Sequence, residues 1–146
     1  KAFALKQFHF HTPSEHTLNG TSYPAEVHLV HAADDGELAV IGVFFEEGAA
    51  SDVLTPVWED LDDFSDVQDA DPVTMNVANM LPSDRTTYTY SGSLTTPPCS
   101  ETVRWHVLQQ PLTMSAEQLQ ALTALYDGNN RPVQPLNDRE VDRVTL

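Results

Sequence analysis

The sequence is poor in basic residues and in cysteine. Its 146 residues include 7 Lys and Arg against 22 Asp and Glu, a formal net charge of −15, and one cysteine, Cys99. This charge repels phosphate backbones and anionic membrane surfaces, so nucleic acid is not an expected partner. One cysteine cannot build a disulfide framework, and a chain of this length buries roughly 70% of its unfolded surface without one. The 40% hydrophobic residues are enough for one domain over residues 1–146.

Long hydrophobic runs are also missing. The longest apolar stretch without glycine, Leu38–Ile41, has four residues. Even when it is extended to Phe45, it is far shorter than the roughly 20 residues of a spanning helix, so we expect no membrane segment. Residue 1 is Lys rather than Met, and no positively charged and apolar leader opens the chain. We therefore expect any targeting peptide to have been removed or left out.

Strands are predicted to outnumber helices. Phe8 and Phe10 alternate with Gln7, His9 and His11, and this period of two is typical of a strand. The segments with strand character are Lys1–His11, Glu26–His31, Leu38–Phe45, Thr86–Tyr90 and Glu101–Leu108. The third segment is almost continuously apolar, which predicts a central strand covered on both faces.

Two helices are predicted between the strands. The first lies within residues 50–71, where apolar residues recur at helical spacing: Leu54, Val57, Trp58, Leu61 and Phe64. The second follows Ser115 and Gln118, which have the spacing of a capping box, and it stops at Asp127–Gly128. Irregular chain is expected at Asp69–Pro82, a turn at Asn19–Gly20, and further turns from Asn129 onward.

Three histidines form the first candidate site. His9 and His11 are two residues apart in a strand, so their side chains project to the same side. A third imidazole from a neighbouring strand, for which His28 is the natural candidate, would leave one tetrahedral position open, as in catalytic zinc sites. Gln7 and Glu26 each precede a candidate ligand by two residues and could accept its spare N–H. Taken alone, the His-x-His pair is more often two polar residues facing solvent.

The other histidines are less suited to such a site. His31 follows His28 by three residues and therefore points to the opposite face of the strand. We expect His16 and His106 to be buried or surface residues with ordinary partners.

Beyond the histidines, several ordered segments match one family pattern. They are Gln7–His11 with Ser14–His16, Ala25–His31, Leu38–Gly42, Tyr90–Pro98 and Asn129–Leu136. Together they resemble the α-class carbonic anhydrases, and the Gly-Ser-Leu-Thr-Thr-Pro-Pro loop is the most distinctive match. The short turn at Asp34–Gly36 and the Thr-Pro after His11 resemble the compact bacterial members. The resemblance implies a mainly β (α+β) fold, with a large twisted, mostly antiparallel central sheet, a few peripheral helices, and a zinc site on the sheet.

The resemblance also implies roles for individual residues. His9, His11 and His28 match the zinc ligands, and their hydrogen-bond partners match Gln7, Glu26 and the main-chain carbonyl of Asn129. Thr95 and Glu15 match the catalytic pair that orients the zinc-bound hydroxide. The apolar wall where carbon dioxide rests matches Val30, Val40, Leu94 and Trp105, with Thr96 beside it.

By resemblance, the protein is a zinc lyase, a carbonate dehydratase with one Zn²⁺ per chain. It would hydrate carbon dioxide reversibly to bicarbonate and a proton by attack of zinc-bound hydroxide, with sulfonamides and anions as expected inhibitors. Two alternatives are a non-catalytic binding or scaffold domain and a zinc-storage protein. Scaffold relatives have usually lost a zinc histidine, whereas all three are present here together with Thr95 and Glu15. The enzyme is therefore the favoured interpretation.

Family members normally carry a further stretch before the Gln7 segment that includes the histidine proton shuttle. We therefore expect the domain to be incomplete at its N-terminus. Cys99 matches a cysteine that commonly pairs with one in that stretch, the alternative being a free buried thiol. The disulfide would imply a periplasmic or secreted protein, and a homodimer is expected by analogy with bacterial members. Pro97–Pro98 is a candidate cis peptide.

Overall fold

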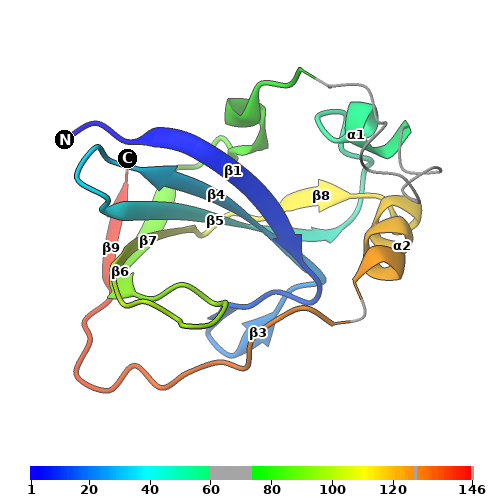
Figure 1. Ribbon diagram of the computed structural model, residues 1–146. Helices are drawn as coiled ribbons and strands as arrows, with labels where there is room; N and C mark the ends of the chain where they lie inside the picture. The colour runs from blue at the N-terminus through cyan, green and yellow to red at the C-terminus, as the bar shows by residue number, and fades with distance from the viewer. Residues whose placement is uncertain (60–73, 127, 146) are drawn as a thin grey trace.

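The computed structural model describes residues 1–59, 74–126 and 128–145, and most of them lie in or around a seven-stranded sheet (Figure 1). The strands of this sheet are β1 (Ala4–His11), β4 (Ala25–Ala32), β5 (Leu38–Glu47), β6 (Thr86–Gly92), β7 (Val103–Leu108), β8 (Leu112–Met114) and β9 (Asp142–Thr145). Their order is β1-β4-β5-β7-β6-β9, with β8 also paired to β5. The β5–β7 and β5–β8 pairs are parallel, and the other pairs are antiparallel. The predicted sheet, mostly antiparallel, is confirmed.

All five predicted strands are present, although β1 begins at Ala4 rather than at residue 1. The prediction of turns throughout the C-terminal tail is wrong for β9, which pairs with β6. All four residues of β9 are exposed, so no apolar alternation marks them as a strand. The Asn19–Gly20 turn is confirmed, and it joins the short strands β2 (Thr17–Leu18) and β3 (Thr21–Ser22). Both turn residues have positive φ, as a two-residue hairpin turn of type I′ requires.

Both predicted helices are present in the described residues. The first, α1, spans Thr55–Glu59; Leu61 and Phe64 of the predicted stripe lie outside the described residues. The second, α2, spans Ala116–Leu125, and its capping box is complete. The segment predicted to be irregular contains a short 3₁₀ helix, Val77–Met80, which is a correction within its described part. In the described ranges, no helix is long and apolar enough to cross a membrane.

The two faces of the sheet carry two separate apolar clusters. The first contains Val43 and Phe45 of β5, packed with Leu54 and with residues of α2. Figure 1 shows α1 and α2 gathered beside β8, where this cluster lies. The second contains Val40 and Phe44, so alternate residues of β5 enter opposite clusters. This two-sided burial explains the almost continuous apolar sequence of β5.

The first cluster supplies a prediction about stability. Phe45 is completely buried, so Phe45→Ala should lower the free energy of unfolding by about 3–5 kcal/mol through lost burial and the cavity it leaves. Leu125→Ala, at an apolar side chain that is 43% exposed, should change it by less than about 0.5 kcal/mol. Urea unfolding followed by circular dichroism measures both values. Equal losses would contradict this placement of the core.

Candidate metal centre

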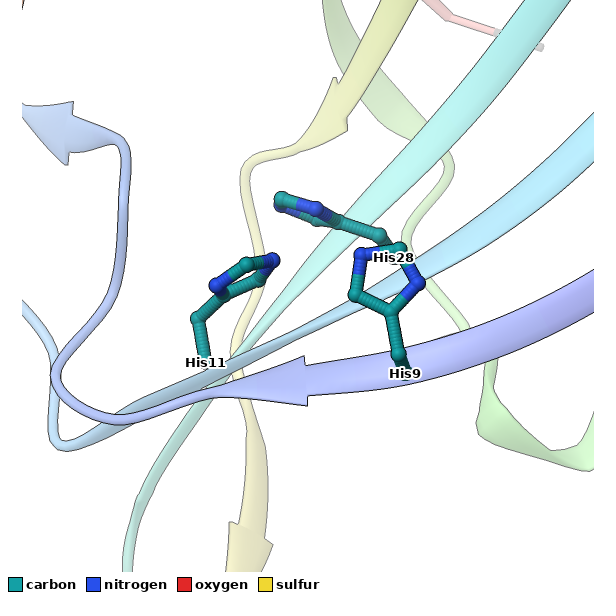
Figure 2. Close-up of side chains that lie close together, drawn as sticks. All are labelled: His9, His11 and His28. Atoms are coloured by element: carbon teal, nitrogen blue, oxygen red, sulfur yellow. The ribbon is translucent and has the colours of Figure 1, made fainter. Parts of the chain in front are cut away.

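The three candidate ligands converge on one face of the sheet. His9 and His11 project from β1, and His28 projects from β4, where it is the register partner of His9. Figure 2 shows the three rings turned toward one another. Their centroids lie 5.0 Å (His9 to His11), 5.3 Å (His9 to His28) and 4.5 Å (His11 to His28) apart. One nitrogen from each ring lies within 4.8 Å of the others, which is a spacing that can hold a metal ion.

Each ring also turns one nitrogen toward a hydrogen-bond partner. The pairs are His9 Nδ1 with Gln7 Oε1 (2.7 Å), His11 Nδ1 with the Asn129 carbonyl (3.0 Å), and His28 Nε2 with Glu26 Oε1 (3.0 Å). All three acceptors are oxygens, so in the neutral rings these nitrogens carry the protons. The nitrogens left with a lone pair are Nε2 of His9, Nε2 of His11 and Nδ1 of His28.

The donor set fits a zinc ion. Nε2 of His11 is buried and has no hydrogen-bond partner in the described part of the chain, which is costly unless something binds it. Burial, with the neighbouring imidazoles, lowers the pKa of His9 to about 4. Burial also lowers the pKa of His11 below its ordinary value. Neutral imidazoles in a three-nitrogen set suit zinc with an open fourth position.

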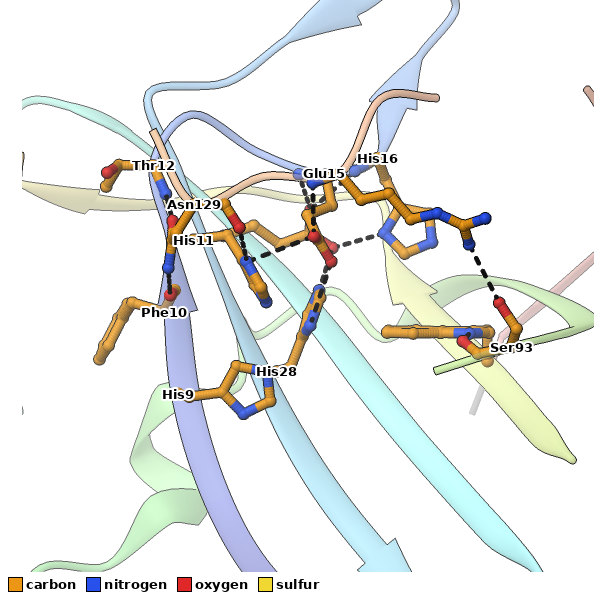
Figure 3. A network of polar contacts seen from close by, with 12 residues as sticks. His9, Phe10, His11, Thr12, Glu15, His16, His28, Ser93 and Asn129 are labelled. Carbon is orange, nitrogen blue, oxygen red and sulfur yellow. Dashed lines mark hydrogen bonds and ion pairs between the residues drawn. The ribbon is translucent and has the colours of Figure 1, made fainter. Parts of the chain in front are cut away.

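Polar contacts join His11 and His28 to Glu15 on this face of the sheet (Figure 3). Behind them, Glu26 is the hub of the network. Its side chain is fully buried, and burial opposes its ionisation. The charge and hydrogen bond of His16, followed by those of His28, outweigh that penalty and hold the pKa of Glu26 well below its usual value. Gly42 of β5 makes room for the carboxylate, because a Cβ at this position would lie 2.8 Å from Glu26 Oε1.

His16 takes part in this network, which the expectation of ordinary partners did not foresee. Its Nδ1 lies 2.6 Å from Glu26 Oε1, and its Nε2 lies 2.6 Å from the Tyr90 hydroxyl. Tyr90 is 74 residues away in the sequence, and no short motif links the two positions. His16, Glu26 and His28 also form a close group, but their atoms are already hydrogen-bonded to one another.

The remaining histidines lie away from the metal face. His31 Nδ1 donates to the Leu29 carbonyl, and its side chain lines a different cavity, as expected from its strand position. His106 lines the same cavity, and its Nδ1 is buried without a partner in the described residues, so the expected ordinary partner is absent. Burial, followed by the nearby Arg104, lowers the pKa of His106.

Glu15 and Thr95 lie on one cavity of about 420 Å³. Glu15 is buried, and its Oε1 accepts a hydrogen bond of 2.8 Å from the backbone N–H of Arg131. Its Oε2 has no partner within the described residues and lies 3.9 Å from His28 Nδ1. None of the hydrogen bonds found among these residues joins Thr95 to Glu15. The structure therefore brings the expected pair to one cavity without connecting them.

Four of the five residues expected around carbon dioxide pack together. Val30, Val40 and Trp105 belong to the second cluster, and Leu94 packs against it. The Trp105 ring lies 4.7 Å from the His28 ring, edge to face.

Thr96, the fifth residue expected at this site, is exposed. The loop that carries it contains the cis Pro97–Pro98 bond predicted from the sequence. Cys99, the next residue, has a positive φ and has no second cysteine in this sequence to pair with, so its disulfide stays a prediction.

Comparison with known proteins gives consistent results. The model of the eukaryotic-type carbonic anhydrase family matches residues 1–145. Carbonic anhydrases of Klebsiella pneumoniae and Pectobacterium atrosepticum are 49% and 45% identical over 141 and 140 residues. Each match covers 95% of this chain and 57% of the relative, so the chain spans just over half the length of these proteins.

Solved structures agree with the sequence matches. The α-carbonic anhydrase of Thermovibrio ammonificans, in complex with the inhibitor sulfanilamide, is 48% identical with a TM-score of 0.85, covering 95% of this chain and 62% of that one. A hyperthermostable carbonic anhydrase from a hydrothermal vent chimney is 48% identical with a TM-score of 0.86, covering 97% and 64%. Because the family model matches residues 1–145 and the three imidazoles come together on the sheet, the chain belongs to the α-carbonic anhydrase family.

Proposed function

We propose that the protein catalyses the reversible hydration of carbon dioxide to bicarbonate with one zinc ion held by His9, His11 and His28. The observation that carries this proposal is the set of three ring nitrogens left free by hydrogen bonds at the opposite nitrogens. A zinc ion held by neutral ligands supplies a Lewis acid that makes water acidic enough to act as a nucleophile near neutral pH.

The residues around the cluster would orient the reactants. Glu15 Oε2 is buried and has no partner among the described residues, and it shares a cavity with Thr95, so it is the acceptor that we propose for the Thr95 hydroxyl. When the Thr95 hydroxyl donates its proton to Glu15, the Thr95 oxygen can in turn accept a hydrogen bond from the nucleophile. This hydrogen bond would fix the orientation of the nucleophile. Trp105, which lines the same cavity and packs in one cluster with Val40, would provide an apolar contact for carbon dioxide, which has no net charge.

Inhibitor binding follows from the same proposal. The Thermovibrio ammonificans relative binds sulfanilamide. A sulfonamide that ionises to an anion with a nitrogen donor suits a zinc ion held by three neutral imidazoles, and we propose that sulfonamides inhibit this protein too.

The direct test is stopped-flow carbon dioxide hydration, with zinc quantified on the same sample. We expect about one zinc per chain and turnover that sulfanilamide abolishes. A purified, folded protein that takes up no zinc from a zinc-supplemented buffer would refute the proposal. Bound zinc without turnover would retain the metal centre and refute the catalytic role of this chain.

The ligand assignment is tested by His28→Ala. Zinc affinity and hydration rate should fall together by more than about 100-fold, because even outer partners of metal ligands contribute 10- to 100-fold. His31→Ala removes a histidine from the opposite face of the same strand and should leave both quantities unchanged. Retention of stoichiometric zinc by His28→Ala would exclude His28 as a ligand.

The orienting role is tested by Thr95→Val, which removes the hydroxyl and keeps the shape of the side chain. Zinc content should be unchanged, whereas kcat/KM for hydration should fall by about 100-fold, the cost of a poorly placed reactant. Thr123→Val, on the exposed face of α2, is the matched control and should be without effect. An unchanged rate in Thr95→Val would contradict the orienting role.

A further inference from the structure

A second cavity, of about 260 Å³, lies on the sheet face opposite the metal centre. Its floor contains two pairs of register partners, His31 with Ala39 on β4 and β5, and Ile41 with His106 on β5 and β7. Val107, the residue after His106, points to the other face and lines the larger cavity there. The sheet therefore separates the second cavity from the metal centre, and none of the three candidate ligands is among the described residues that line it.

Much of the lining of this second cavity is apolar. Its volume is below the roughly 300–1,000 Å³ of pockets for drug-sized ligands, so the space suits a single ring or a short chain. The chain has 22 Asp and Glu, but neither residue type is among the described residues that line the cavity. The space can therefore take the apolar body of a ligand and does not repel an anion. The apolar side chains are those of Phe3, Ala39, Ile41, Leu81 and Leu108.

Arg85 brings a positive charge to the same cavity. It directly precedes β6 and is half-buried, and its guanidinium forms no ion pair or hydrogen bond within the described part of the chain. A second cation, Arg104, is the register partner of Ala39 on β7. Burial, followed by the charge of Arg104, lowers the pKa of His106, so this cation acts on the cavity floor as well. In a chain with a net charge of −15, two arginines beside one apolar cavity favour a negatively charged ligand.

Two buried polar atoms beside the cavity lack hydrogen-bond partners. They are Nδ1 of His106 and Oγ1 of Thr89, and neither finds a partner among the described residues. The two residues are register partners on β7 and β6, so their side chains lie next to each other on the same face of the sheet. Buried polar atoms without partners are rare and costly. A carboxylate can accept from both an imidazole N–H and a hydroxyl, so it supplies the acceptor that this corner lacks.

We propose that the second cavity binds a small ligand with an apolar body and one carboxylate. The carboxylate lies near Arg85 and His106, and the apolar body packs over Ile41. An inorganic anion would leave the apolar lining without contacts, and an uncharged ligand would leave the arginine without a partner. Because the sheet separates the two sites, binding here needs no metal, and the inference does not rest on the proposed function.

Benzoate, with one ring and one carboxylate, is the probe for this site. It is titrated into the full chain freed of metal, so that no ion attracts the anion, and proton–nitrogen correlation NMR follows the histidine rings. We expect the His106 signals to shift and saturate with a dissociation constant of about 1 mM, which is within reach of so small a ligand. The signals of His9 and His11 should stay in place. Benzamide, which has the same shape without the charge, should bind about 10-fold more weakly.

Two variants with matched controls locate the binding site. Arg85→Gln removes the charge and should weaken benzoate binding about 10-fold. Arg143→Gln removes a charge from β9 at the register partner of Tyr88, which lines the cavity of the other face, and should leave the affinity unchanged. Ala39→Leu fills the second cavity and should abolish the saturable shift. Ala124→Leu, at an exposed position of α2, is its control and should bind benzoate normally.

Several outcomes would overturn the proposal. They are the absence of a saturable shift at His106 up to about 10 mM benzoate, equal affinity for benzamide, and unchanged affinity in Arg85→Gln. The arginine variant keeps the test decisive even if Ala39→Leu lowers the stability of the fold. A shift confined to His9, His11 and His28 would place benzoate at the metal centre and refute the second site. Zinc uptake and turnover are measured separately, so failure of the proposed function leaves this result unaffected.

Discussion

The buried carboxylate of Glu26 is the constraint on which the arrangement of the site depends. A charge removed from water is costly unless it is paired and hydrogen-bonded. Four N–H groups meet this requirement: the rings of His16 and His28 at Oε1, and the backbone of Glu15 and His16 at Oε2. The loop after β1 must therefore fold back over β4, and this return places Glu15 beside the ligands. The buried carboxylate also needs space, and Gly42 leaves it, since the Cβ of any larger residue would lie too close to Glu26 Oε1.

Trp105 packs against this polar network. Its ring lies 4.8 Å from the His16 ring and 4.7 Å from the His28 ring, in edge-to-face arrangements. Its indole N–H donates to the carbonyl of Ser93, so the polar edge of the ring is satisfied as well. One aromatic side chain thus packs against two imidazoles and fixes the start of the loop that carries Thr95. The same ring lines the cavity of Glu15 and Thr95. A change in the position of Trp105 would therefore alter both the cavity and the packing of the histidines.

Local periodicity predicted the parts of the site that lie on single strands. Residues two apart on β1 and β4 share a face, and this was enough to place His9 with Gln7 and His28 with Glu26. The register of the two strands could not be derived in the same way, because it depends on the chain folding between them. It sets His9 directly opposite His28.

The contacts that the sequence could not predict are those between distant segments. The Asn129 carbonyl was assigned only through the family resemblance, and the side chain of Asn129 forms hydrogen bonds with Thr12 and Phe10, which lie 117 and 119 residues away in the sequence. The bond between His16 and Tyr90 and the bond from Arg131 to Glu15 are equally non-local. Short fully exposed strands such as β9 carry no pattern of burial either, and pairing across the sheet alone defines them.

The arrangement of ligands and partners also has a consequence for the order of assembly. The three imidazoles come from two antiparallel strands that are close in the sequence, so they can meet early, after closure of a short loop. The backbone that orients His11 arrives from more than a hundred residues later, once the tail has crossed the sheet. In a nascent chain the three imidazoles would thus meet before His11 has its acceptor. Occupancy of the proposed metal centre would then report completed folding, because that acceptor is in place only after β1 and the tail have met.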